Sequence, residues 1–183
     1  MLLKILVGVA AAVVLVVGAL ALIVAMRPSE FRIERSTTIA APAPAVFTQV
    51  NDFHNWQAWS PWAKLDPDVK NSYDGAPAGK GAVFAWAGNT KVGEGRMTIT
   101  ESRPSELVRV KLEFLKPFTA TNTAEFTFKP EGDRTAVTWS MFGHNNFISR
   151  AVFLFMDMDK ALGGEFEKGV ASMKSAAEAS ARR

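Results

Sequence analysis

Cysteine is absent from the 183-residue sequence, and the two histidines are His54 and His144. A chain without cysteine forms no disulfide bond and has no thiolate nucleophile. Two histidines this far apart in the sequence also lack the ligand spacing of a zinc site. We therefore expect neither a metal nor another cofactor. The missing cysteines are compatible with either side of a membrane.

A strong excess of charge is missing too. The sequence has 21 Lys and Arg against 18 Asp and Glu, for a formal net charge of +3. Domains that bind nucleic acid usually carry a basic patch or stripe, and this near balance of charge supplies none. Nucleic acid is therefore not an expected partner.

Charge is missing altogether from Ile5 to Met26, a run of Ile, Leu, Val, Ala, Gly and Met. As an α-helix, this run would be about 33 Å long at ~1.5 Å per residue, enough to cross a hydrocarbon core of ~30 Å. A cleavable signal peptide usually has a shorter apolar region, and apolar residues here continue past the cleavage-like Ala19-Leu20-Ala21. We expect residues 1–27 to form an uncleaved, single-pass membrane anchor.

The basic residues that flank this run do not decide its orientation. Lys4 and the amino terminus lie on one side of it, and Arg27, Arg32 and Arg35 lie on the other. Because Lys and Arg near the ends of a membrane segment set its orientation, two nearly balanced clusters leave either side of the membrane open. The oligomeric state is left open as well.

The remaining residues, 28–183, have the length of one domain with a hydrophobic core. Much of this part alternates apolar and polar residues with a period of two, which is typical of strands with one buried face. Short turn sequences separate these stretches, so we expect an antiparallel sheet with one apolar and one solvated face. The alternating stretches are residues 31–39, 69–73, 82–87, 97–100, 108–114, 124–129 and 137–141.

Helical spacing occurs in two other places. After the first strand, residues 44–51 predict a short helix, and Asp52 is a plausible N-cap for a second one through Ala58. Near the end, apolar residues recur at steps of three and four, which predicts helical structure at 147–156 and a long helix at 157–181. Gly163-Gly164 inside the long helix suggests a close backbone approach, a kink, or a place where a ligand passes.

Particular residues along this order of elements carry a family resemblance. They are Ala41-Pro42 before Val46-Phe47, Asn51-Asp52, Trp56, Trp59-Ser60-Pro61-Trp62, Gly81 with Trp86, Gly95 with Met97, Thr138-Trp139, and Phe166-Glu167-Lys168-Gly169-Val170 before Met173-Lys174. With them, residues 31–178 resemble the START-like (SRPBCC) superfamily, in particular its polyketide cyclase/dehydrase group. The resemblance implies an α+β helix-grip fold, in which a curved antiparallel sheet wraps around the long C-terminal helix.

The resemblance also implies a deep apolar cavity between sheet and helix that binds lipids, sterols, polyketides or other hydrophobic molecules. Aromatic and methionine side chains on the inward side of the predicted elements are the candidate lining, although some of them must be core. These candidate ligand-binding residues are Trp56, Trp59, Trp62, Phe84, Trp86, Met97, Phe114, Phe126, Trp139 and Met141.

Three functions are compatible with these patterns. We favour a membrane-anchored domain that binds a lipid-, quinone- or polyketide-like molecule, because an apolar sheet face without an acid/base constellation suits binding. The second is a cyclase- or dehydratase-type enzyme with His54 or Tyr73 as proton carrier, since histidine titrates near neutrality. The third is a membrane-tethered scaffold whose own side chains fill the cavity. The resemblance brings no catalytic signature, so we assign no catalytic residue.

Overall fold

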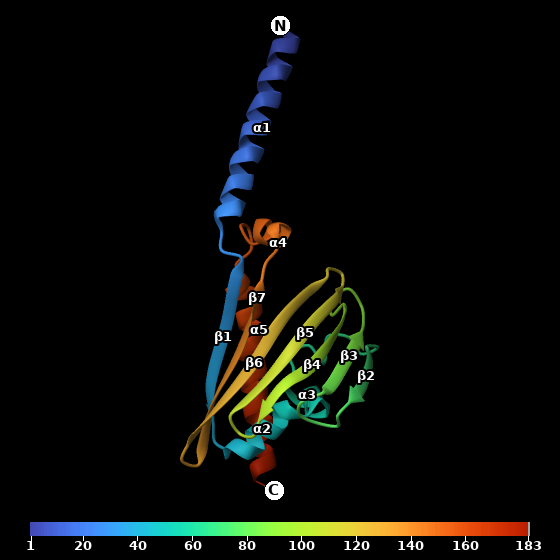
Figure 1. Cartoon of the computed structure of the whole chain (residues 1–183), viewed down its shortest axis with the longest axis vertical. Helices are drawn as coiled ribbons and strands as arrows, with labels where there is room; N and C mark the ends of the chain where they lie inside the picture. The colour runs from blue at the N-terminus through green and yellow to red at the C-terminus, as the bar shows by residue number, and fades with distance from the viewer. Residues whose placement is uncertain (183) are drawn as a thin grey trace. The chain divides into compact units, whose positions relative to one another are not determined.

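The computed structural model describes residues 1–182, which form two compact units. One unit comprises residues 1–31 and 144–158, and the other comprises residues 32–143 and the chain from 159 onward. The elements in chain order are α1 (Leu2–Met26), β1 (Glu30–Ile39), α2 (Ala43–Asn51), the 3₁₀ helix η1 (Phe53–Asn55), α3 (Trp56–Trp59), β2 (Lys70–Gly75), β3 (Ala82–Ala87), β4 (Glu94–Arg103), β5 (Leu107–Lys116), β6 (Ala120–Glu131), β7 (Arg134–His144), α4 (Phe147–Val152) and α5 (Met158–Ala181) (Figure 1).

The strands form one sheet in the order β1-β7-β6-β5-β4-β3-β2. Strands β2 to β7 pair antiparallel with their neighbours in sequence, and β1 joins the far side of β7. Figure 1 shows this sheet as a curved layer with α5 running along it. The antiparallel sheet, the two short helices after β1 and the long closing helix confirm the predicted α+β helix-grip fold.

Alternation in the sequence directs every second side chain of a strand toward the core, and this pattern holds from the edge strand β1 inward. In β1, Ile33 and Ile39 are buried while the residues between them alternate between partly and fully exposed. The register then sets inward side chains of neighbouring strands opposite one another, as with Phe126 and Trp139. Such cross-strand pairs stabilise a sheet by roughly 0.2–1 kcal/mol each.

The long helix α5 covers this apolar face. Its buried residues Phe166, Val170, Met173 and Ala177 recur at three- and four-residue steps, as an amphipathic helix requires. The helix begins at Met158 rather than at Asp157, a difference within the usual uncertainty of helix ends. The strand centres are also confirmed, whereas most strands extend beyond the alternating stretch because hairpin ends lie in solvent and need no apolar row.

Two glycines let other side chains lie against the backbone of α5. At Gly169, an added Cβ would stand 2.5 Å from Cζ3 of Trp139, so the indole ring rests directly on the helix. At Gly163, an added Cβ would overlap the guanidinium of Arg35. Gly163 is therefore a close-approach position, while a Cβ at Gly164 would meet open space.

Arg35 occupies the space that Gly163 leaves. Its Nη1 lies 3.0 Å from Oδ1 of Asp159, and its Nε donates to Oε1 of Glu167 at 2.7 Å. These carboxylates stand one helical turn to either side of Gly163, so the guanidinium bridges them along the helix axis. The bonds that Arg35 donates to Asp159 and then to Glu167 raise the pKa of Arg35, and the bond to Arg35 lowers the pKa of Asp159. Ion pairs of Arg35 with Asp159 and Glu167 therefore connect β1 to α5.

The other unit contains α1 and the segment around α4. Helix α1 is long and apolar enough to cross a membrane, judged by length and composition. Helix α4 contacts α1, and Asn145 N donates to the carbonyl of Ser29, in the link between α1 and β1, at 2.7 Å. Helical structure predicted for 147–156 ends at Val152, and a turn follows it.

Candidate functional site

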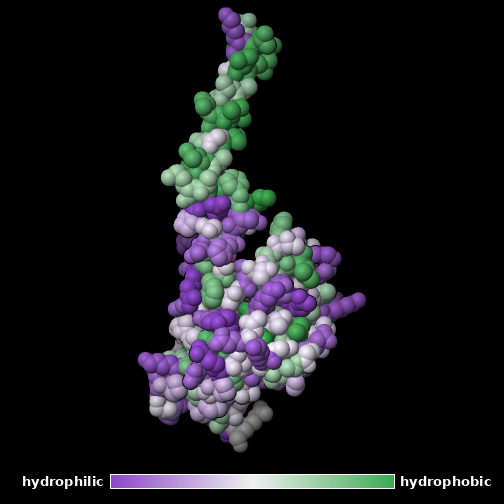
Figure 2. Space-filling model, viewed as in Figure 1, coloured by the Kyte–Doolittle hydropathy of each residue, from purple (hydrophilic) through white to green (hydrophobic). Residues whose placement is uncertain are grey.

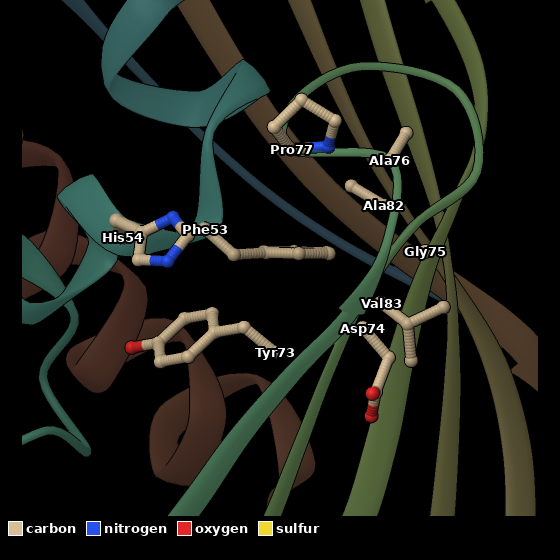
Figure 3. Close-up of a pocket in the computed structure, with 9 residues that line it drawn as sticks. All are labelled: Phe53, His54, Tyr73, Asp74, Gly75, Ala76, Pro77, Ala82 and Val83. Carbon is tan, nitrogen blue, oxygen red and sulfur yellow. The ribbon is translucent and has the colours of Figure 1, made fainter.

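A pocket of about 190 Å³ lies beside strands β2 and β3. Figure 3 shows His54, Phe53 and Tyr73 on one side of it and Val83 with Asp74 on the other. The 3₁₀ helix η1, the two strands and the loop between them supply its walls. Its lining residues are Phe53, His54, Tyr73, Asp74, Gly75, Ala76, Pro77, Ala82 and Val83.

His54 is held in place by Asp52 and Tyr73. Oδ1 of Asp52 accepts from the backbone N–H of His54 at 2.9 Å and lies 2.8 Å from its Nδ1. The imidazole stacks on the ring of Tyr73, with centroids 4.1 Å apart and planes inclined by 14°. Asp52 is thus the N-cap of η1 and also orients the imidazole through Nδ1, which leaves Nε2 on the side of the ring away from Asp52.

Asn51 holds the β2–β3 loop, which contributes Ala76 and Pro77 to the pocket lining. Its carbonyl accepts from Gly79 N at 2.8 Å, and its Oδ1 accepts from the hydroxyl of Ser102 at 2.7 Å. One residue therefore links the end of α2, the β2–β3 loop and β4. Gly79 has a φ of +72°, which an L-residue rarely adopts, so this loop geometry depends on glycine.

The two proton-carrier candidates, His54 and Tyr73, therefore come together in one pocket, although 19 positions separate them in the sequence. The contribution of Asp74, Ala76 and Pro77 to the lining was not predicted from the sequence. No spacing in the sequence shows the tertiary contact that brings the end of β2 and the loop after it against η1.

A row of partly exposed aromatic rings continues from the pocket along the sheet. Centroids of Tyr73 and Phe84 lie 5.2 Å apart, those of Phe84 and Trp86 6.1 Å, and those of Trp86 and Phe114 6.0 Å. Tyr73 lies on β2, Phe84 and Trp86 lie two positions apart on β3, and Phe114 lies on β5. The geometry of the sheet therefore sets the spacing of the rings. We call Tyr73, Phe84, Trp86 and Phe114 the aromatic row.

Backbone geometry holds Trp86 within this row. Its Nε1 donates to the carbonyl of Val92 at 3.0 Å, and its ring covers Gly95, where an added Cβ would overlap it. The indole of Trp86 can therefore lie against β4 only because Gly95 has no side chain. Trp86, Phe84 and Phe114 were all predicted to bind ligand, and the structure places them side by side.

Most of the other predicted ligand-binding residues are buried. Trp56 and Trp59 donate their indole N–H groups, each at 2.9 Å, to the carbonyls of Val50 and Gln49, which ties the short helices to α2. Both rings meet Phe126 edge-to-face. The buried members of the predicted set are Trp56, Trp59, Met97, Phe126, Trp139 and Met141. The four aromatic rings among them contact one another, and a ligand contact for all six side chains stays a prediction.

Trp139 and Trp62 lie where sheet and helix meet. The Trp139 ring stacks on Phe166 of α5, with centroids 4.1 Å apart and planes inclined by 8°. Its Nε1 is buried and makes no hydrogen bond within residues 1–182. Trp62 meets Trp139 edge-to-face at 5.9 Å and is itself partly exposed. Of the predicted tryptophans, Trp62 and Trp86 are therefore the ones whose side chains are partly exposed to solvent.

The opposite face of the sheet carries paired charges. Arg109 bonds the carboxylates of Glu101 and Glu125, which raise the pKa of Arg109, with Glu125 the larger influence. Bonds from Lys111 and then Arg96 lower the pKa of Glu113. This face is a solvated surface of ion pairs. Within residues 1–182, no group of His, Asp and Glu side chains is arranged to hold a metal ion.

Comparison with known protein families identifies the family of this chain. Residues 30–178 match the family described as "Polyketide cyclase / dehydrase and lipid transport". The chain belongs to this family. The polyketide cyclase/dehydrase resemblance drawn from Asn51-Asp52 and the tryptophan cluster is thereby confirmed, and the match covers all strands of the sheet and most of α5. No curated protein sequence matches the chain.

Solved structures share the fold of this family member at low sequence identity. A protein from Thermobifida fusca is 21% identical, with a TM-score of 0.60 over 80% of this chain and 92% of its own. The Aha1 dimer from Colwellia psychrerythraea is 14% identical, with a TM-score of 0.55 over 81% and 96%. The di-domain ARO/CYC StfQ of the steffimycin biosynthetic pathway is 13% identical, with a TM-score of 0.58 over 84% of this chain and 52% of its own. Identities this low support the common fold and nothing finer.

Proposed function

We propose that residues 28–183 form a helix-grip domain that binds a hydrophobic small molecule, and that residues 1–27 anchor it in a membrane. The aromatic row carries this proposal. Its side chains lie on the sheet face that also forms the core, yet they stay partly exposed. Covering a large apolar side chain contributes about 1.5–3 kcal/mol, so a ligand that spans the row gains from several rings at once.

The geometry of the row favours a flat or extended apolar ligand. Successive ring centroids are 5.2 to 6.1 Å apart, and Phe84 and Trp86 are nearly parallel at 20°. Rings spaced in this way contact a chain or a fused-ring system along its length rather than a compact polar molecule. A lipid-, quinone- or polyketide-like molecule fits this description, in agreement with the family's description, which names both polyketide cyclase and lipid transport.

Removing one ring of the row tests the binding proposal. We expect Phe114→Ala in the detergent-solubilised full chain to weaken binding of a lipophilic fluorescent probe roughly 10- to 100-fold, because about 1.5–3 kcal/mol of apolar contact is lost. Titration of probe fluorescence measures this change.

Phe142→Ala is the matched control. Phe142 is also partly exposed and in a strand, but it lies on the charged face under Arg32, whose Cζ is 5.1 Å from the ring centroid. Equal losses in both variants, or a wild-type chain that binds no lipophilic probe and carries no apolar molecule in native mass spectrometry, would overturn the proposal.

The His54 pocket supports an enzyme as the second candidate. His54 and Tyr73 line the same cavity, and Asp52 orients the imidazole as a second group orients a general base. In this hypothesis a bound poly-carbonyl chain exchanges a proton with Nε2 of His54 or with the phenol of Tyr73.

Proton transfer by one positioned side chain typically contributes 10²–10⁴-fold to a rate. If the enzyme hypothesis holds, His54→Ala or Tyr73→Phe lowers turnover of a linear poly-carbonyl substrate by at least ~100-fold, followed by liquid chromatography of products. His144→Ala is the control, because His144 lies outside the pocket lining. Unchanged turnover in both pocket variants rules these roles out and leaves the binding function unaffected.

A further inference from the structure

The segment that follows β7 exposes large apolar side chains. Ile148 is 73% exposed and Phe155 is 85% exposed. Side chains of this kind recur through the segment, whose exposed apolar members are Phe147, Ile148, Val152, Phe155 and Met156. Five exposed large apolar side chains within ten residues indicate a contact with something other than water.

The same segment is bound to the end of α1. Arg150 donates through Nη1 to the carbonyls of Arg27, at 3.0 Å, and Ala25, at 3.3 Å. These are carbonyls that an α-helix leaves without a partner at its C-terminal end. Val24, one turn earlier, is buried although the rest of α1 is exposed. Helix α4 is thus fixed at the level where α1 ends.

A bilayer is the occupant that this arrangement fits. If α1 spans a membrane, its C-terminal end lies at the interface between hydrocarbon and water. Figure 2 shows that the surface of α1 is mostly apolar along its length, with polar residues at both of its ends. Residues 144–156 carry Arg150 but no Asp or Glu, so nothing in this stretch repels an anionic headgroup. Short elements with apolar and basic side chains lie in such interfaces.

We propose that residues 147–156 form a second membrane contact, in which Phe147, Ile148, Val152, Phe155 and Met156 enter the interfacial layer of the leaflet that α1 reaches at its C-terminal end. This inference rests on the proposed anchor role of α1. The segment inserts shallowly, because α4 has a single short run of helix and Arg150 stays at the headgroups. The unit then holds the membrane through a spanning helix and a surface patch.

The absence of cysteine makes this proposal directly testable. Single cysteines are introduced at Ile148, Phe155, Val13 and Asp133 and labelled with an environment-sensitive NBD fluorophore. Val13 is in the middle of α1, and Asp133 is in an exposed polar turn. The full chain is reconstituted in phosphatidylcholine vesicles with an anionic lipid, and circular dichroism confirms that each variant is folded.

We expect labels at Ile148 and Phe155 to emit at shorter wavelength than the label at Asp133 and to be quenched by lipids with a nitroxide near the headgroup. The label at Val13 should be quenched most by a nitroxide deep in the acyl chain. Emission at Ile148 and Phe155 equal to that at Asp133, with Val13 quenched, overturns this inference and leaves the anchor standing. An unquenched label at Val13 overturns the anchor itself.

Shielding by protein is separated from shielding by lipid in the same measurement. Blue-shifted emission at Ile148 and Phe155 without nitroxide quenching means that a second copy of the chain covers the segment, and this result also overturns the proposal. Quenching at both positions by the headgroup nitroxide, relative to the same vesicles without nitroxide lipid, supports it.

Discussion

Replacing Trp59 by alanine should lower the free energy of unfolding by about 3–5 kcal/mol, the usual cost of deleting a buried tryptophan. Trp59 is 1% exposed, contacts the rings of Trp56, Phe126 and Trp139, and donates to the carbonyl of Gln49. Its loss leaves a cavity in the core and an unpaired carbonyl at the end of α2. Urea unfolding of the detergent-solubilised full chain, followed by near-UV circular dichroism, measures the change.

Trp62→Ala is the informative comparison for this variant. Trp62 belongs to the same cluster, but its ring is partly exposed and no hydrogen bond of its indole occurs within residues 1–182. We expect a loss of only ~1 kcal/mol, since part of the ring surface already meets water. If Trp59→Ala is as mild as Trp62→Ala, Trp59 is no core residue and the partition between core and ligand-facing tryptophans is wrong.

The second large effect concerns Gly169. A methyl group at this position meets the Trp139 ring at 2.5 Å and Pro61 at 3.3 Å, so either the indole or α5 must shift. Overpacking of this kind typically costs 1–3 kcal/mol. The shift also disturbs the stacked pair of Trp139 and Phe166 that joins sheet to helix. We therefore expect Gly169→Ala to be destabilised in spite of the better helix propensity of alanine.

Gly164→Ala separates these two contributions. The position lies in the same helix, but its Cβ meets nothing within 4 Å. Alanine there should stabilise the chain by up to ~1 kcal/mol through helix propensity alone. The difference between the two variants in midpoint of thermal unfolding then reports the clash with Trp139. Equal stability of both would show that α5 does not rest on the indole.

The fold was predictable because its signals are local. Alternation in stretches such as 108–114 and three-to-four spacing around Phe166 each depend on a few neighbouring residues, and short turns limit the sheet to hairpins. The position of β1 beside β7 is not local, since no spacing in the sequence pairs these strands. The family resemblance predicted a curved sheet around the long helix, but the order of the strands came only from the structure.

The site was less predictable than the fold. Parity shows which side chains face inward, but it does not show which inward side chains neighbouring rings cover, so Phe126 and Phe114 looked equivalent in the sequence. The structure separates them, because Phe126 lies under the two short helices and Phe114 near the end of β5 does not. The pairing of His54 with Tyr73 was invisible for a similar reason, since it depends on where η1 meets the sheet.

The place of β1 in the sheet has a consequence for how the chain is made. During synthesis, β1 is the first strand to emerge, yet its neighbour β7 and the carboxylates that hold Arg35 come more than 100 residues later, at sequence separations of 124 and 132 for Asp159 and Glu167. Strands β2 to β7 can pair successively as hairpins, whereas β1 has no partner strand until β7 has been synthesised. We therefore expect β1 and α5 to reach their final positions together, after α5 has been synthesised and packs on the sheet.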